Sequence, residues 1–422
     1  MKILIMIFHA SRSATMNALL SNAASCFRSF LQLIIALGLL SSAVARDKKP
    51  DEFGSPSELK PGTTGLLIEP VKGMKYFLKV PRRYDARKGA RLIMFLHGSN
   101  MNGLDYLKTI DSNRWADEDI ICCPNGENGN DPYGQNNFSQ VSGPLVAEVT
   151  REVQKALKTT VTYIGGHSQG AFLTYNVVLN YPELYQGAFP MAGDCWMQNE
   201  PNLWENKPDV LQKLRQIPIA VIHGKADPVV LFSQGEHAYD CFRAMGWTKL
   251  RLFAPEKLNH MFGIAPIDEA LEWLETVNGN NEKKALSLAK KWAKDGEWGW
   301  VRHAVKGTSA AAGVEKAAED AAAKALPAVL EAMKGNPKKW VPTWVEFWRI
   351  HGESAAAKIA VEDYLNKREQ ERATAAEIFS QSQAAFRSSN ENEAYQHLEK
   401  LLQTGAHTYQ GYFAWKWLSE KK

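Results

Sequence analysis

The sequence predicts a mostly parallel β-sheet flanked by helices, followed by an all-α region. Between residues 65 and 277, short apolar runs typical of buried strands alternate with helical segments. A glycine-flanked serine joins one such strand to the next helix. From residue 282 onward, alanine, lysine and glutamate dominate and strand-like runs stop. A chain of 422 residues has room for two domains.

The pentapeptide 166–170, Gly-His-Ser-Gln-Gly, is the strongest chemical signal in the chain. It follows the β-branched and aromatic run Thr160–Ile164 and precedes a predicted helix, Gln169–Asn180. Glycines on both sides permit a tight, strained turn that exposes a serine hydroxyl as a nucleophile. The alternative is that Ser168 only caps the helix.

Other polar candidates follow other buried strands. Three apolar runs end directly before or near clusters of polar residues: Arg91–Leu96 before His97–Asn100, Pro218–Ile222 before His223–Pro228, and Leu250–Phe253 before Asn259–Met261. Parallel sheets hold their active sites beyond the carboxyl ends of their strands. The candidates therefore predict a site at that edge, with Ser, Asp and His in chain order.

This order, together with the serine turn and His97-Gly98, resembles the α/β-hydrolase superfamily over about residues 65 to 277. The chain looks most like esterases grouped with polyhydroxybutyrate depolymerases, feruloyl esterases and phospholipase/carboxylesterases. The resemblance implies a Ser-Asp-His triad and an oxyanion hole of two backbone amides. The matching residues are Ser168 as nucleophile, Asp227 as acid, His260 as base, and the amides of Gln169 and Ser99. Many relatives continue the His-Gly turn with glycines or bulky apolar residues, whereas this chain has the polar run 99–102.

Two residues compete for the triad roles. Asp194 follows the predicted strand Gly187–Met191, and His237 lies in the helical stretch 234–245, soon after Asp227. We expect His260 and Asp227 to fill the roles, because they follow the last two strands. His97 and His223 end strands and are expected to orient loops. His167 precedes the nucleophile and either touches substrate or packs in the core.

The first 45 residues predict a signal peptide. They contain three basic residues, no acidic residue, and an apolar run, Phe30–Leu40, that leads to Ala43-Val44-Ala45. The run is too short to span a bilayer, which takes about 20 residues. We therefore expect cleavage near Ala45 and export to a periplasmic or extracellular location, with no stable membrane span in the mature chain. The segment is long, so Met16 is an alternative start.

Charge and cysteine content exclude several classes of function. Cleavage would lower the net charge from +4 to +1, which gives no support for nucleic-acid binding. Four cysteines would remain, namely Cys122, Cys123, Cys195 and Cys241. They could form up to two disulfides or stay as buried thiols. Because no C-x-x-C or H-E-x-x-H pattern is present, metal chemistry has no support, and the serine-hydrolase mechanism implies no cofactor.

The region after residue 278 is expected to be a separate helical domain. We place an extended leader at 46–64, the catalytic domain at 65–277, a linker at 278–283 that few contacts cross, and the helical domain at 284–422. Its last three predicted helices, 373–386, 393–402 and 409–418, resemble tetratricopeptide-type pairs. The region would pack within the protein or bind a protein partner, and its eight tryptophans are expected to be core residues.

The predicted function is hydrolysis of carboxylic esters through an acyl-enzyme on Ser168. Its substrate would be a small-molecule or polymer-linked ester. The polar loop 124–143 favours short-acyl or aryl esters on hydrophilic carriers. The alternatives are a peptidase of the same fold and a helical-repeat binding or scaffold protein with a retired hydrolase domain.

Overall fold

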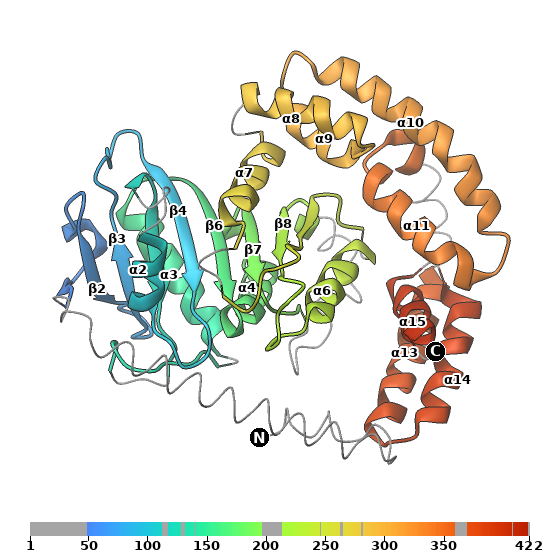
Figure 1. The fold of residues 1–422 in the computed structure, drawn as a ribbon, viewed down its shortest axis with the longest axis horizontal. Helices are drawn as coiled ribbons and strands as arrows, with labels where there is room; N and C mark the ends of the chain where they lie inside the picture. Colours follow the sequence, from blue (N-terminus) through green and yellow to red (C-terminus); the bar gives the residue numbers. More distant parts are fainter. Residues whose placement is uncertain are drawn as a thin grey trace.

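A computed structural model describes residues 49–111, 117–127, 131–139, 141–195, 213–244, 246–261, 265–279, 282–358, 369–406 and 408–420. The predicted signal peptide, including Met16, lies outside these residues. A nine-stranded sheet forms the centre of the first part of the chain, and helices follow it (Figure 1). Among the described residues, none of the helices combines the length and the apolar composition needed to cross a bilayer.

The strand order is β1-β2-β3-β5-β4-β6-β7-β8-β9. The strands are β1 (Asp51–Glu52), β2 (Thr64–Ile68), β3 (Lys75–Lys79), β4 (Ala90–Leu96), β5 (Ile120–Pro124), β6 (Thr159–His167), β7 (Gly187–Met191), β8 (Ile219–Ile222) and β9 (Leu250–Phe253). From β5 to β9 all neighbours are parallel, whereas β3 is antiparallel to both β2 and β5. The sheet is therefore mostly parallel, as predicted, with a mixed edge.

Helices cover both faces of this sheet (Figure 1). Those of the first part are α2 (Gly103–Asp111), α3 (Ser142–Ala156), α4 (Gln169–Asn180), α6 (Phe232–Ala244) and α7 (Ile267–Val277). Alternate strand residues point to opposite faces. Leu92 and Met94 belong to the core under α3, α4 and α6, whereas Ile93 and Phe95 belong to the core under α2 and α7.

The second part of the chain is helical, as predicted. Its helices are α8 (Glu282–Lys294), α9 (Trp298–Val305), α10 (Ala311–Ala332), α11 (Pro337–His351), α13 (Glu369–Arg387), α14 (Glu391–Gly405) and α15 (Tyr409–Glu420). The first two continue the layer of α7, where the rings of Trp273 and Trp300 meet edge to face at 5.8 Å. Short 3-10 turns occur at Pro56–Glu58 and Pro182–Leu184.

Helix α9 covers the edge strand β9. The indole nitrogen of Trp300 donates to the Leu250 carbonyl at 3.2 Å, and the Arg251 guanidinium lies 5.3 Å from a ring of Trp300. Covering an edge strand removes a surface on which another chain could add a strand. This contact gives the start of the helical region a direct structural role in the sheet.

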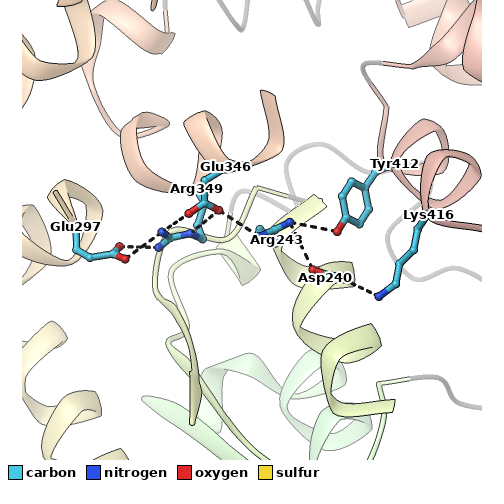
Figure 2. Close-up of polar contacts among 7 residues, drawn as sticks. All are labelled: Asp240, Arg243, Glu297, Glu346, Arg349, Tyr412 and Lys416. Atoms are coloured by element: carbon cyan, nitrogen blue, oxygen red, sulfur yellow. Dashed lines mark hydrogen bonds and ion pairs between the residues drawn. The ribbon is translucent and has the colours of Figure 1, made fainter. Parts of the chain in front are cut away.

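The helical region also packs against α6, which lies on the other face of the sheet from α7. Partly buried ion pairs and hydrogen bonds connect α6 with α11, α15 and the residue before α9 (Figure 2): Arg349 with Glu297 and Glu346, Arg243 with Glu346 and Tyr412, and Asp240 with Lys416. Gly246 approaches Trp348 so closely that an added Cβ would lie 1.8 Å from the indole nitrogen. The expectation that few contacts cross residues 278–283 was therefore wrong.

Candidate active site

Ser168 stands at a strained turn between β6 and α4. Its backbone angles are φ 54° and ψ −118°, a combination that non-glycine residues rarely adopt. Its N–H donates to the Met191 carbonyl at 2.9 Å, which extends the pairing of β6 with β7 by one residue. The turn has the geometry expected of a serine nucleophile and differs from a simple helix cap, because Ser168 makes no side-chain cap bond.

The glycines on both sides of this turn are required by close packing. A Cβ at Gly166 would lie 2.3 Å from the Gly170 carbonyl oxygen, and a Cβ at Gly170 would lie 2.2 Å from the Leu96 carbonyl oxygen. The start of α4 thus rests on the end of β4. This contact explains the pentapeptide pattern, since any side chain at either position would push the serine turn away from the sheet.

Asp227 and His260 form a hydrogen-bonded pair. His260 Nδ1 donates to Asp227 Oδ2 at 2.8 Å, and the Asp227 side chain is fully buried. The other carboxylate oxygen accepts the N–H groups of Val229 and Val230 at 2.8 and 3.0 Å. Burial alone would raise the pKa of Asp227, but the bonds from His260 and these amides outweigh it, and the pKa is lowered. Asp227 therefore stays ionised and orients the His260 ring through its Nδ1.

Two loops bring this pair together. Past the end of β8, the N–H groups of Lys225 and Ala226 donate to the carbonyls of Pro255 and Leu258. Gly224 lies so close to Leu258 that an added Cβ would be 2.0 Å from its carbonyl oxygen. The loop after β8 is thus fastened to the loop after β9. Residues 33 positions apart in sequence meet because their loops extend from neighbouring parallel strands.

His167 connects the Ser168 turn with His260. Its Nε2 donates to the His260 carbonyl at 2.7 Å, so its Nδ1 must accept the hydroxyl proton of Tyr106, also at 2.7 Å. Burial and the neighbouring His260 lower the pKa of His167 to about 3, which keeps it neutral. The sequence left open whether His167 touches substrate or packs in the core. The structure shows a packed side chain that makes two hydrogen bonds.

Ser168 and His260 lie close to each other without a direct hydrogen bond. The rings of His167 and His260 are 4.6 Å apart, and Ser168 is the next residue in the chain. Among the described residues, no hydrogen bond joins Ser168 Oγ to His260. Such bonds are often long in free enzymes and tighten when substrate binds. Ser168 is partly exposed and the His260 side chain is 20% exposed, so both can meet a ligand.

The expected oxyanion donors flank this turn. Gly98 lies next to Ser168, because a Cβ built on Gly98 would be 3.5 Å from the Ser168 Cβ. Within the described part of the chain, the N–H groups of Ser99 and Gln169 have no intramolecular acceptor. Two unpaired amides beside a nucleophile are what an oxyanion hole requires. The side chain of Gln169 is held apart, since its Oε1 accepts the Phe138 N–H at 2.9 Å.

The competing residues form a second pair elsewhere. His237 Nδ1 lies 2.8 Å from Asp194 Oδ1, on the side of α6 that faces the loop after β7. His97 and His223 are buried and bond to main-chain carbonyls, of Gly98 and Val230 respectively, as expected of loop-orienting residues. Burial lowers the pKa of both rings. In the described residues, the one group able to hold a metal ion is Cys195, His237 and Cys241.

Sequence comparison matches part of this region to a known family. Residues 129–277 fit the phospholipase/carboxylesterase family, and this range includes Ser168, Asp227 and His260. The mostly parallel sheet, the helices on both faces and the serine turn agree with that match. This part of the chain has the α/β-hydrolase fold, and over residues 129–277 it is similar to a family of the carboxylesterase type. No curated protein matches the chain.

Several solved structures are similar to about half of the chain. A thermostable esterase is 21% identical with a TM-score of 0.37, and the match covers 50% of this chain and 61% of the esterase. Acyl-protein thioesterase 2 of Zea mays is 20% identical with a TM-score of 0.39, over 47% of this chain and 96% of that protein. An acetyl xylan esterase of Aspergillus awamori is 13% identical with a TM-score of 0.41, over 50% and 99%.

Two elements of the site were missed at the sequence level. Tyr106 on α2 holds His167, and nothing in its surroundings in the sequence distinguishes it from a core tyrosine. The amides of Val229 and Val230 hold Asp227, and here a signal existed. Asp227 is followed by Pro228, and an aspartate before such a turn often accepts the N–H groups two and three residues later.

Proposed function

We propose that the chain hydrolyses carboxylic esters through an acyl-enzyme on Ser168. The observation that carries this proposal is the chain of contacts from the strained Ser168 turn through His167 to His260, whose ring is bonded to the buried Asp227. Ser168 would attack the ester carbonyl while His260 Nε2 takes its proton. His260 would then protonate the leaving alcohol and activate the water that releases the acid.

The remaining groups would stabilise the charges that form during the reaction and fix the position of the His260 ring. Asp227 is ionised and buried, so it would stabilise the imidazolium formed on His260 during each step. The amides of Gln169 and Ser99 would donate to the carbonyl oxygen as it becomes negative. His167 would fix the main chain at His260 and thereby the position of the ring.

We also propose short-acyl or aryl esters on hydrophilic carriers as substrates. Near the turn, Asn100 and Asn137 are joined by two hydrogen bonds of 3.0 and 2.9 Å, and Ser99 and Asn100 are exposed. In the loops after β8 and β9, Val229, Leu231 and Met261 are exposed apolar side chains, at 44, 59 and 57%. A polar carrier would contact the asparagines, and a small apolar group would contact these apolar side chains.

A small hollow lies against His167 and His260, and its walls include Met191, Ile222 and Leu258. Ser168 does not line this hollow, so we do not assign it as the acyl pocket. Export after cleavage near Ala45 stays part of the proposal, and N-terminal sequencing of the secreted protein tests it.

The decisive experiment is covalent labelling. A fluorophosphonate probe should label the purified protein at Ser168, as located by peptide mass spectrometry, and Ser168→Ala should abolish the label. A folded wild-type protein that takes no label would favour the binding or scaffold alternative. Esters from acetate to palmitate, feruloyl and acetylated-sugar esters, and a peptide anilide then define the substrate. An optimum at long acyl chains, or cleavage of the anilide alone, would overturn the substrate proposal.

A further inference from the structure

Four side chains that the proposed mechanism does not use converge behind the nucleophile turn. Asp194 and Cys195 lie in the loop after β7, and His237 and Cys241 lie one helical turn apart on α6. Residues four apart share one face of a helix, so the sequence spacing places His237 and Cys241 together. The fold then adds Cys195 from 42 positions upstream of His237.

The distances within this cluster suit a tetrahedral metal ion. The ligand atoms of Cys195, His237 and Cys241 all lie within 4.8 Å of one another, and His237 Nε2 is 3.5 Å from Cys241 Sγ. Zinc bonds of about 2.0–2.1 Å to nitrogen and about 2.3 Å to sulfur give an N–S separation of roughly 3.6 Å around a tetrahedron. The observed separation is therefore close to that of a formed site.

Asp194 orients the histidine for such a role. Both of its carboxylate oxygens lie within 2.9 Å of His237 Nδ1, at 2.8 and 2.9 Å. A carboxylate on Nδ1 leaves Nε2 as the nitrogen that faces the sulfur atoms. Histidines that bind metal ions usually carry such a partner on the other ring nitrogen, which fixes the tautomer and the ring plane.

We propose that Cys195, His237 and Cys241 form a zinc site, with Asp194 as the residue that orients His237. Two thiolates and one imidazole bind Zn²⁺ in preference to the hard cations Mg²⁺ and Ca²⁺, which prefer oxygen ligands. Binding would release the protons of both thiols to solvent. Three protein ligands leave one position for a water molecule or a small added ligand.

The burial of the two cysteines argues against a second catalytic centre at this cluster. Cys241 with His237 and Asp194 has the order of groups found in thiol hydrolases, but a nucleophile must reach a substrate. Cys195 and Cys241 are only 3 and 2% exposed, whereas the His237 side chain is 19% exposed. The partly exposed His237 would admit an ion, whereas the burial of both cysteines argues against access of an ester to their sulfur atoms.

The site would fasten the loop after β7 to α6. This loop begins at Met191, whose carbonyl accepts the Ser168 N–H, and Gly193 in the same loop packs on Ala171 and Phe172 of α4. A bound ion would therefore hold the support of the nucleophile turn from behind. We expect zinc to raise stability and to affect turnover only through that support.

Metal binding by the full chain tests this proposal. The protein is reduced, stripped with a chelator and then titrated with Zn²⁺ or Co²⁺. We expect one ion per chain, the absorption bands of tetrahedral cobalt with thiolate-to-metal charge transfer, and a rise in Tm of about 5 °C at a Zn²⁺ concentration about 100-fold above Kd. Cys195→Ser and Cys241→Ser should each abolish the charge-transfer band or reduce it by about half.

The matched control is Cys123→Ala, which removes a buried thiol of β5 outside the cluster and should keep full binding. If a cluster variant fails to fold, the cobalt spectrum of the wild-type protein decides alone, because it reports thiolate ligation directly. Absence of thiolate bands, or their persistence in a Cys195→Ser/Cys241→Ser variant, would overturn the site. A Cys195–Cys241 disulfide in the protein as isolated, found by alkylation without reductant and mass spectrometry, would also overturn it in favour of a redox pair.

Discussion

Two histidine–aspartate pairs lie at the carboxyl edge of the same sheet, and their shortest N–O distances are both 2.8 Å. His260 pairs with Asp227 on loops after β9 and β8, whereas His237 on α6 pairs with Asp194 after β7. The pairs differ in what surrounds the other ring nitrogen. The first ring lies against His167, next to Ser168, and the second faces the sulfur of Cys241.

The difference shows that a short histidine–carboxylate bond does not identify a catalytic base. The bond fixes a tautomer, and the neighbour of the remaining nitrogen decides what that tautomer can do. The His260 side chain is 20% exposed and packs against His167, the residue before the strained Ser168. For His237 the remaining nitrogen points to two nearly buried thiols, which suit a metal ion. The proposed roles of the two pairs can be separated by substitution.

The largest expected effect is on kcat, when members of the two pairs are substituted one at a time and compared. His260→Ala and Asp227→Asn should each lower kcat for a p-nitrophenyl ester by about 10³ or more, because they remove the proton acceptor or its correct tautomer. His237→Ala and Asp194→Asn should lower it less than about tenfold. Circular dichroism checks folding. If Asp194→Asn proved as harmful as Asp227→Asn in folded protein, the acid would have to be reassigned.

A smaller effect is expected at the contact that links Ser168 with the first pair. Tyr106→Phe removes the hydroxyl that donates to His167 Nδ1, so His167 can turn and release the His260 main chain. We expect kcat to fall by about tenfold with KM little changed. A shift in the pH–rate profile would accompany the loss, since the ring of His260 would be held less firmly. Tyr133→Phe, whose hydroxyl makes only a 3.4 Å bond to Pro50, is the control and should behave as wild type.

The ion pairs of Arg349 on α11, far from the proposed site, should affect stability alone. Arg349 is 3% exposed in its side chain and bonds Glu297 and Glu346, so Arg349→Met would leave two carboxylates without their main partner. We expect a loss of about 2 kcal/mol of unfolding free energy, since both partners keep some contact with water. Turnover per folded molecule should be unchanged. The exposed pair of Lys334 and Glu331 gives the control, and Lys334→Met should change the unfolding free energy by less than about 0.5 kcal/mol.

The smallest effect concerns acid stability. The pKa of Asp227 is lowered in the folded chain, so its ionised form stabilises the fold above the unfolded value of about 3.9, and this contribution is lost as the pH falls through the lower folded value. The difference in unfolding free energy between wild type and Asp227→Asn should therefore be constant at neutral pH and shrink below about pH 4. A difference that grows on acidification would contradict the ionised state of Asp227.

The sequence predicted the features that follow from local pattern. The apolar run before His97 is β4, the run before His223 is β8, and the helix after Ser168 has the predicted bounds. These succeed because a buried parallel strand needs a continuous apolar run and the serine turn needs small neighbours. The grouping of Asp227 and His260 also followed from strand order, although their catalytic roles stay a proposal.

The remaining features depend on contacts between distant segments. Nothing local indicates that Tyr106 meets His167, or that Cys195 meets the His237 face of α6. The absence of a short metal motif in the sequence says little when ligands come from two elements. The packing of Trp348 against Gly246 was missed for the same reason, since a composition change at residue 278 carries no information on docking.

The continuous packing around α6 has a consequence for how the protein unfolds. One buried cluster includes strand residues such as Met94 and Val221 together with Trp340, Trp344 and Leu398 of the helical region. Elements that share a core lose their packing together. The two halves should therefore melt in a single calorimetric transition, with equal van't Hoff and calorimetric enthalpies, although their compositions would suggest two independent units.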